Sequence, residues 1–248
     1  MRPVDRIPDD PEARREWLER WVAERGAPVR PPARSLHNRL AMSWAELVRR
    51  SERYADHVLD RRLETGGHVW DEAVHGQPGR VGYGPTAWHV LPRALRYVGA
   101  AEKDVLVDFG CGKGRVLHQA AKWPLRRVIG VEVSPELADF ARGLLVAHRG
   151  EYRCKDIEVV VSDAALYEVP DDLTIAYLYD PFRGEILDTV LRNIVASIDR
   201  RPRRVWLIHV HPRAGARVLE TGRFRLRTML RGGLRDVQRY RTAIFESC

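Results

Sequence analysis

Three acidic residues in the middle of the chain have the spacing of a cofactor-binding site. Asp108, Glu132 and Asp163 each stand at the end of a short apolar run that is typical of a buried strand. In a parallel sheet the carboxyl ends of neighbouring strands meet at one edge, where ligands bind. Carboxylates there can accept hydrogen bonds from hydroxyl or amino groups and attract a cation. Each acid alone could be a turn or cap residue, but the set of three indicates a site for a small polar cofactor.

A glycine-rich segment follows the first of these acids. Residues 107–115 read VDFGCGKGR, in which the glycines allow a tight turn and a close approach of backbone N–H groups to a ligand. A dinucleotide fingerprint needs a glycine at the sixth position counted from Gly110, where this chain has Arg115. Asp108 would repel a pyrophosphate and attract an ammonium group. The segment therefore disfavours NAD and favours a cofactor that carries a positive charge.

From about residue 84 onward, strand-like runs alternate with helical stretches, and these elements must position the acids and the glycine-rich segment. This alternation predicts an α/β fold with helices on both faces of a parallel sheet. The expected strands are 105–108, 127–132, 157–161, 174–179 and 204–210. The expected helices are 114–122, 135–148 with Ser134 as its N-cap, 184–197 and 214–219. Period-two runs at 224–230 and 239–245 predict a closing antiparallel pair.

Residues 1–80 are expected to form a polar, helical N-terminal appendage to the main domain at 81–248. Asp10 and Pro11 begin one amphipathic helix, and a capping box at Ser43 begins a second that runs to about Glu64. A proline-rich joint separates the two helices. The appendage either packs against the main domain or forms a lid over a substrate pocket.

Composition places the chain among ordinary globular proteins. It has 248 residues, of which 44% are hydrophobic and 31% are charged. No run approaches the 18 apolar residues of a membrane span, and the first 25 residues are too charged for a signal peptide, so we expect a cytoplasmic protein without membrane contact. Three separate cysteines without a CxxC pair suggest neither a disulfide framework nor a zinc site.

The charge balance is compatible with an anionic partner. The formal net charge is +8, yet only four of the 42 basic residues are lysines. Such an arginine bias also follows from GC-rich coding. Nucleic acid is therefore a partner that the composition allows but does not favour.

The region from about Tyr83 to the C-terminus resembles a known enzyme family. Its strongest motifs are VLVDFGCGKGR, VIGVEVSPELADFAR and VVVSDA. With them it resembles the class I S-adenosylmethionine-dependent methyltransferases. The resemblance implies a Rossmann-like, mostly parallel seven-stranded sheet with an antiparallel last strand. It also implies S-adenosylmethionine as cofactor and S-adenosylhomocysteine as product.

The same resemblance implies a role for each motif. Asp108 and the glycine loop would hold the amino-acid end of the cofactor, Glu132 the ribose, and Asp163 with Ala164 the adenine. The loop residues concerned are Gly110, Cys111, Gly112 and Gly114.

A short segment upstream, Gly82-Tyr83-Gly84-Pro85-Thr86, is similar to the tyrosine-proline segment of some lysine methyltransferases of this fold. The similarity implies that Tyr83 and Thr86 contact the methionine carboxylate or line the methyl channel. An ordinary turn before a helix at 87–98 accounts for the same residues.

The fourth expected strand ends in Tyr179-Asp180-Pro181-Phe182, where the methyl acceptor binds in this family. The sequence partly resembles the Asp/Asn-Pro-Pro-Tyr/Phe motif of amino methyltransferases but lacks the second proline, which disfavours a planar amide or nucleobase acceptor. Asp180 could still contact the cofactor and orient or deprotonate an amine, with Tyr179 or Phe182 binding a cationic substrate through its ring. The alternative is that Asp180 caps the next helix.

His209 and His211 end the fifth expected strand. Strand alternation predicts that they share one face, and either could remove a proton from the acceptor. Without a third ligand nearby we expect no metal site. A purely structural role for both histidines is the alternative.

These patterns together predict a methyltransferase that acts on an amine or hydroxyl of a small molecule. A protein lysine methyltransferase and a nucleic-acid-binding or nucleic-acid-modifying protein that uses the basic surface stay open. An aminopropyl transferase of the same fold is disfavoured, because the main domain has no dense acidic cluster beyond Asp171 and Asp172.

Overall fold

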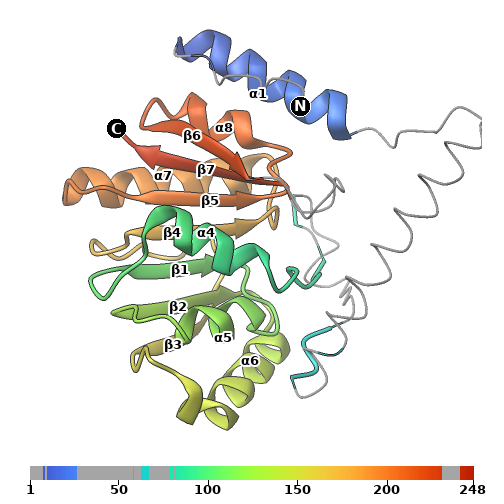
Figure 1. The fold of residues 1–248 in the computed structure, drawn as a ribbon, viewed down its shortest axis with the longest axis vertical. Helices are drawn as coiled ribbons and strands as arrows, with labels where there is room; N and C mark the ends of the chain where they lie inside the picture. The colour runs from blue at the N-terminus through green and yellow to red at the C-terminus, as the bar shows by residue number, and fades with distance from the viewer. Residues whose placement is uncertain are drawn as a thin grey trace, which may run out of the picture.

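A seven-stranded sheet with the order β3-β2-β1-β4-β5-β7-β6 runs through the molecule (Figure 1). The computed structural model describes residues 8, 10–26, 58, 63–66, 79–80, 82–230 and 241–248. The strands are β1 Val105–Phe109, β2 Arg127–Glu132, β3 Ile157–Val161, β4 Ile175–Tyr179, β5 Trp206–Val210, β6 Phe224–Leu230 and β7 Thr242–Ser247. β1 to β5 pair in parallel, and β7 is antiparallel to both β5 and β6. The predicted fold class, with its antiparallel last strand, is confirmed.

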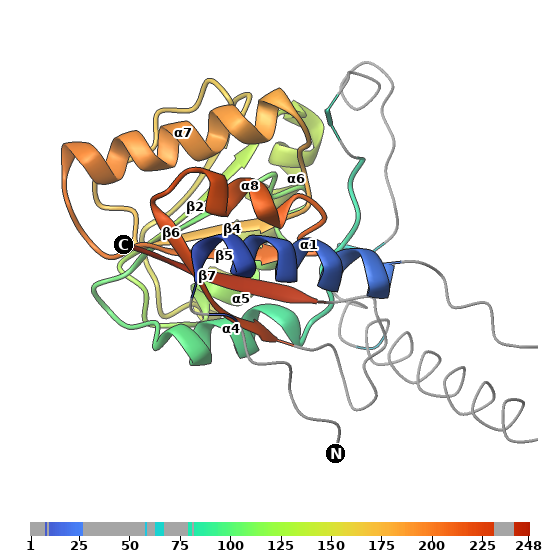
Figure 2. The ribbon, with the colours of Figure 1, turned by 90° about the horizontal axis from the view of Figure 1, so that it is seen from above.

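Alternation of apolar side chains along the strands gives the sheet two buried faces. In β1, Val105, Val107 and Phe109 pack on the side of α7 and α8, whereas Leu106 packs on the side of α4, α5 and α6. Seen from above, α7 and α4 lie on opposite sides of the sheet (Figure 2). The helices are α1 Pro11–Gly26, α4 Val90–Val98, α5 Arg115–Ala121, α6 Pro135–Ala147, α7 Glu185–Arg200 and α8 Gly215–Glu220, with a short 3-10 helix η1 at Arg149–Glu151.

The parallel register brings the carboxyl ends of the strands to one level. Phe109 pairs with Val131, and Glu132 pairs with Val161. The loops that follow β1, β2 and β3 therefore begin side by side at one edge of the sheet. At the start of α6, the Ser134 hydroxyl accepts a hydrogen bond from the backbone N–H of Leu137 (3.4 Å), which confirms the predicted N-cap.

The first predicted helix, α1, lies along α8 (Figures 1 and 2). It begins as expected, because the Asp10 carboxylate accepts a hydrogen bond from the N–H of Ala13 (2.7 Å). Leu18 is fully buried among the side chains on the α7 and α8 face. An ion pair between Arg15 and Glu220 (3.2 Å) adds a surface contact of small expected energy. Most of the second predicted helix, 43–64, lies outside the described residues.

In the described part of the chain, no helix is both long and apolar enough to cross a membrane.

Gly130, at the centre of β2, is a position where the fold tolerates no side chain. A Cβ atom there would lie 2.5 Å from Cδ1 of Leu117 and 2.7 Å from Sγ of Cys111. We expect Gly130→Ala to lower the free energy of unfolding by about 1–3 kcal/mol through overpacking. Urea denaturation measures this change in the free energy of unfolding.

The control is Gly143→Ala in α6, where nothing lies within 4 Å of the added Cβ and alanine should stabilise the helix by up to about 1 kcal/mol. Equal effects of the two changes would contradict the packing argument.

Candidate functional site

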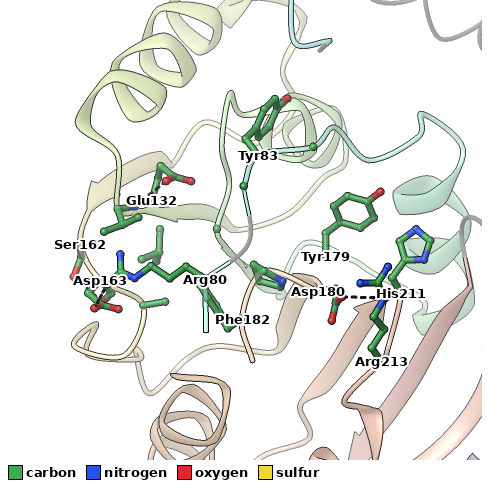
Figure 3. A pocket seen from close by; sticks show the side chains of 17 residues that line it. Arg80, Tyr83, Glu132, Ser162, Asp163, Tyr179, Asp180, Phe182, His211 and Arg213 are labelled. Carbon is green, nitrogen blue, oxygen red and sulfur yellow. Dashed lines mark hydrogen bonds and ion pairs between the residues drawn. The ribbon is translucent and has the colours of Figure 1, made fainter. Parts of the chain in front are cut away.

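The carboxyl edge of the sheet surrounds a cavity of about 360 Å³, within the range of small-molecule sites. Figure 3 shows Glu132, Ser162 and Asp163 at one end of it and Tyr179, Asp180, His211 and Arg213 at the other. The remaining lining residues are Arg80, Gly82, Tyr83, Gly84, Gly110, Val131, Val133, Ala164, Pro181 and Phe182. One cavity therefore joins residues expected to bind a cofactor with residues expected to bind an acceptor.

Glu132 organises the cofactor end of the cavity. One carboxylate oxygen accepts the N–H of Gly112 (2.8 Å), and the other accepts those of Val133 (2.9 Å) and Ser134 (3.0 Å). The side chain is 5% exposed, so these charge-assisted bonds hold the glycine loop against the end of β2. The expected contact of Glu132 with a ribose stays a prediction.

The glycine loop supplies shape more than hydrogen-bond donors. The N–H groups of Gly110 (2.8 Å) and Cys111 (3.1 Å) both donate to the carbonyl of Val131. The N–H of Gly114 donates to the carbonyl of Cys111 (2.9 Å). Gly112 has a φ of +53° and a Cβ there would collide with the ring of Tyr83. The sequence suggested that such N–H groups face a ligand. The structure shows that these three N–H groups, and that of Gly112, which donates to Glu132, are bonded within the protein.

Several residues expected at the cofactor are placed beside the cavity rather than on its wall. Cys111 is buried against Gly130, and Gly114 packs closely on Ala141 of α6. Thr86 is also buried, and its carbonyl accepts a hydrogen bond from the guanidinium of Arg115 (3.0 Å).

Tyr83, in contrast, lines the cavity, and its hydroxyl donates to the carbonyl of Thr65. A residue that lies far away in the sequence thus fixes the ring that covers the glycine loop.

Asp108 tests whether a cationic cofactor fits this site. It is 2% exposed, and burial, followed by the nearby charge of Glu132, raises its pKa well above the usual range. No described cation contributes to the pKa of Asp108. Two buried acids of like charge are stabilised when a bound group brings a positive charge close to them. Asp108, like Gly112, does not line the cavity, whereas Glu132 does. The negative charge of the two acids fits the positive charges of S-adenosylmethionine at this end of the site.

Asp163 has a partner that the sequence did not indicate. Its Oδ2 forms an ion pair with Nη2 of Arg80 (2.6 Å), and its Oδ1 accepts the N–H of Ala165 (3.0 Å). Arg80 lines the cavity, and its side chain extends toward Asp163 (Figure 3). Backbone contacts hold Arg80 in place, since it forms a β-bridge with Phe182 and the carbonyl of Gly79 accepts the N–H of Arg183 (2.8 Å).

At the acceptor end, two neighbouring strands both finish in the left-handed backbone region. Asp180, after β4, has a φ of +44°, and His211, after β5, has a φ of +51°. Non-glycine residues adopt this region at a cost of about 1 kcal/mol or more, which is typical of functional sites. Both side chains line the cavity. The strained turns therefore point two polar groups at the same space.

Asp180 is a buried carboxylate whose ionic partners all lie beyond hydrogen-bond distance. Its Oδ2 is 3.6 Å from Nε of Arg213 and 3.8 Å from Nη2 of Arg183, and its Oδ1 has no hydrogen-bond partner among the described residues. Burial raises its pKa to about 6, against the opposing effect of the two arginines. A carboxylate in this state is prepared to accept a hydrogen bond or a proton from a bound molecule.

The two histidines do not share a face. His209 is 1% exposed and does not line the cavity; its Nε2 lies 3.9 Å from Oδ1 of Asp180, and burial lowers its pKa to about 4, so the ring is neutral. β5 ends at Val210, and the left-handed turn at His211 breaks the strand alternation on which the prediction depended. His211 lies against Tyr179, with ring centroids 5.3 Å apart.

No three of the described His, Cys, Asp and Glu side chains come together in a way that could hold a metal ion. Sequence reasoning missed Arg80, Ser162 and Arg213 as lining residues. Ser162 belongs to the motif VVVSDA and Arg213 is two residues after His211, so their positions could have been inferred. Arg80 gave no such signal.

Comparison with known proteins relates part of the chain to methyltransferases. Residues 106–199 match the family model of a methyltransferase domain. An uncharacterized RNA methyltransferase of Bdellovibrio bacteriovorus is 29% identical over 131 residues, which are 52% of this chain and 31% of that protein. A protein-lysine N-methyltransferase of Saccharolobus islandicus is 29% identical over 92 residues, which are 35% of this chain and 57% of that protein. The chain thus spans less than two thirds of either relative.

The similar solved structures have low sequence identity to this chain. The RNA methyltransferase from Salinibacter ruber, in complex with S-adenosyl-L-homocysteine, is 20% identical with a TM-score of 0.48, and the match covers 66% of this chain and 93% of that one. The matched residues, the strand order and the strand-end acids agree with the class that the motifs predicted. Residues 106–199 thus resemble a methyltransferase domain, for which the motifs predict S-adenosylmethionine as the cofactor.

Proposed function

We propose that the protein transfers a methyl group from S-adenosylmethionine to an amine of a small molecule, with a hydroxyl as the second acceptor type. The observation that carries this proposal is the unpartnered Oδ1 of Asp180 in the wall of the cavity that also holds Glu132 and Asp163. The rings of Tyr179 and Phe182 line the same space and favour a cationic amine. Arg213 adds a positive charge that can pair with an anionic group on the acceptor.

In this proposal the protein contributes mainly position, proton acceptance and exclusion of water. When bound, S-adenosylmethionine supplies a methyl group on a positively charged sulfur, which needs no further activation. Glu132 and Asp163 hold one end of the cavity in a fixed shape, and Asp180 at the other end accepts the acceptor's N–H or O–H. With a pKa of about 6, Asp180 is ionised at neutral pH and can take up the acceptor's proton.

A protein lysine side chain is the second candidate acceptor. It is also an amine, so the chemistry at Asp180 would be the same, and one relative is named a protein-lysine N-methyltransferase.

The test proceeds in two stages on the purified chain. Calorimetric titration with S-adenosylmethionine, S-adenosylhomocysteine and NAD should give micromolar binding of the first two and none of the third. A labelled methyl donor is then offered with small amines, hydroxyl compounds, peptides and RNA. Label in small amines supports the proposal, and label only in peptides moves the assignment to protein lysine. Transfer only to RNA would refute both, and absence of cofactor binding would refute the proposed activity itself.

A further inference from the structure

A second cavity lies at the other end of α5 from the glycine loop. It has a volume of about 450 Å³ and shares no lining residue with the first. Four flat side chains, of Trp88, His118, Trp123 and His148, line it together with Gln119 and Lys122. α5 has seven residues and a length of roughly 10 Å, so one short helix connects the cofactor loop to this second site.

Three of the four rings pack against one another. His118 lies edge-on to Trp88, with ring centroids 6.2 Å apart, and edge-on to His148, at 5.2 Å. The Nδ1 atom of His118 is 2.8 Å from the hydroxyl of Tyr152. Burial, with smaller effects of nearby cations, lowers the pKa of His118 to about 4, so this wall is an uncharged ring at neutral pH.

Gln119 is the unusual group in this wall. It is 6% exposed, and neither its amide oxygen nor its amide nitrogen has a hydrogen-bond partner in the described part of the chain. The indole N–H of Trp88 is buried and unpartnered in the same way. Buried polar atoms almost always have partners, so two unsatisfied groups beside one cavity point to a ligand that supplies them.

We propose that this cavity binds the base of an adenine nucleotide. A glutamine amide offers one donor and one acceptor side by side, which match the N7 acceptor and the N6 amino group of adenine. Flat aromatic and histidine rings are the surfaces on which bases stack. Lys122, at the rim, is 45% exposed and lies 2.8 Å from Glu151, so a phosphate group can compete for it. This site is additional to the proposed function and does not depend on it.

Titration of the full chain with AMP and CMP tests the site, with two matched variants. Gln119→Leu keeps the size of the side chain but removes the amide, whereas Asp163→Asn alters the first cavity alone. We expect AMP to bind more tightly than CMP, its affinity to fall at least about 10-fold in Gln119→Leu, and no change in Asp163→Asn. Without nucleotide, Gln119→Leu should melt at an equal or higher temperature, because it removes an unsatisfied amide. Such stability shows that lost binding does not reflect lost folding.

Two results would overturn the proposal. One is the absence of AMP binding to the unmodified chain at millimolar concentration. The other is AMP binding that Asp163→Asn weakens and Gln119→Leu does not, since the nucleotide would then occupy the first cavity. A ten-nucleotide oligoadenylate distinguishes the two sources of the base. Tighter, salt-sensitive binding of the oligomer that also depends on Gln119 supports the site with RNA as the source, and equal affinities support it with a free nucleotide.

Discussion

Replacing Asp180 by asparagine is expected to lower the rate of methyl transfer by about 100-fold or more, and at the same time to stabilise the fold. The rate falls because an amide at this position cannot take up a proton from the acceptor. The fold gains because Asp180 is buried and its charge is poorly satisfied, as its pKa of about 6 shows. A rise of this pKa from 3.8 to about 6 corresponds to a loss of about 1–3 kcal/mol of stability, which the neutral amide should recover at pH 8.

The sign of the pH dependence follows from the direction of this shift. The folded protein binds the Asp180 proton more tightly than the unfolded chain, whose carboxyl has the usual value near 3.8. Between about pH 4 and pH 6 the folded state therefore holds more protons, so the contribution of Asp180 to stability decreases as the pH rises through this window. The stabilising effect of Asp180→Asn should be largest above pH 6 and should diminish below it. The rate of the unmodified enzyme should rise with pH up to about 6, and the variant should lack this limb.

Measuring kcat and KM from pH 5 to pH 8, with urea unfolding at both ends of the range, checks both effects. Asp139→Asn is the matched control, because Asp139 is exposed and lies on α6. Full activity of Asp180→Asn would remove Asp180 from the mechanism. An equal loss of stability at every pH would show that its charge is better satisfied than the structure indicates.

Replacing Glu132 by alanine is expected to weaken cofactor binding by about 100-fold and to destabilise the domain by about 3 kcal/mol or more. The change leaves the backbone N–H groups of Gly112, Val133 and Ser134 without their acceptor in a buried place. The glycine loop then loses its link to the end of β2, and the cavity loses the carboxylate expected at the ribose. Calorimetry with S-adenosylhomocysteine and urea unfolding measure the two losses.

Two further variants separate the causes. Glu132→Gln keeps one oxygen acceptor and should recover part of the stability but little of the affinity. Glu136→Ala, on the exposed first turn of α6, should change neither. Normal cofactor affinity in Glu132→Ala would show that the loop keeps its shape without the carboxylate and that the cofactor does not contact Glu132.

The strands, their succession along the chain and the acids at their ends could be predicted from the sequence alone. β2, β3 and β6 have the predicted bounds, because a period-two or continuous apolar pattern is a local property that the chain expresses wherever a sheet can form. Ser134 and Asp10 cap their helices as predicted for the same reason, since an N-cap depends on three or four consecutive residues. Glu132 and Asp163 lie in one cavity because parallel strands end at one edge.

Only the tertiary structure decided which partner each of these groups has. The pair of Arg80 with Asp163 joins residues 83 positions apart, and no local pattern encodes such a contact. His209 and His211 separate because His211 adopts a left-handed backbone, which depends on the packing around the end of β5 rather than on strand periodicity. The carbonyl of Val131 and the carboxylate of Glu132 take up the glycine-loop N–H groups, since β2 lies next to β1. The unsatisfied amide of Gln119 likewise exists only in three dimensions, because burial and missing partners are properties of the packed chain.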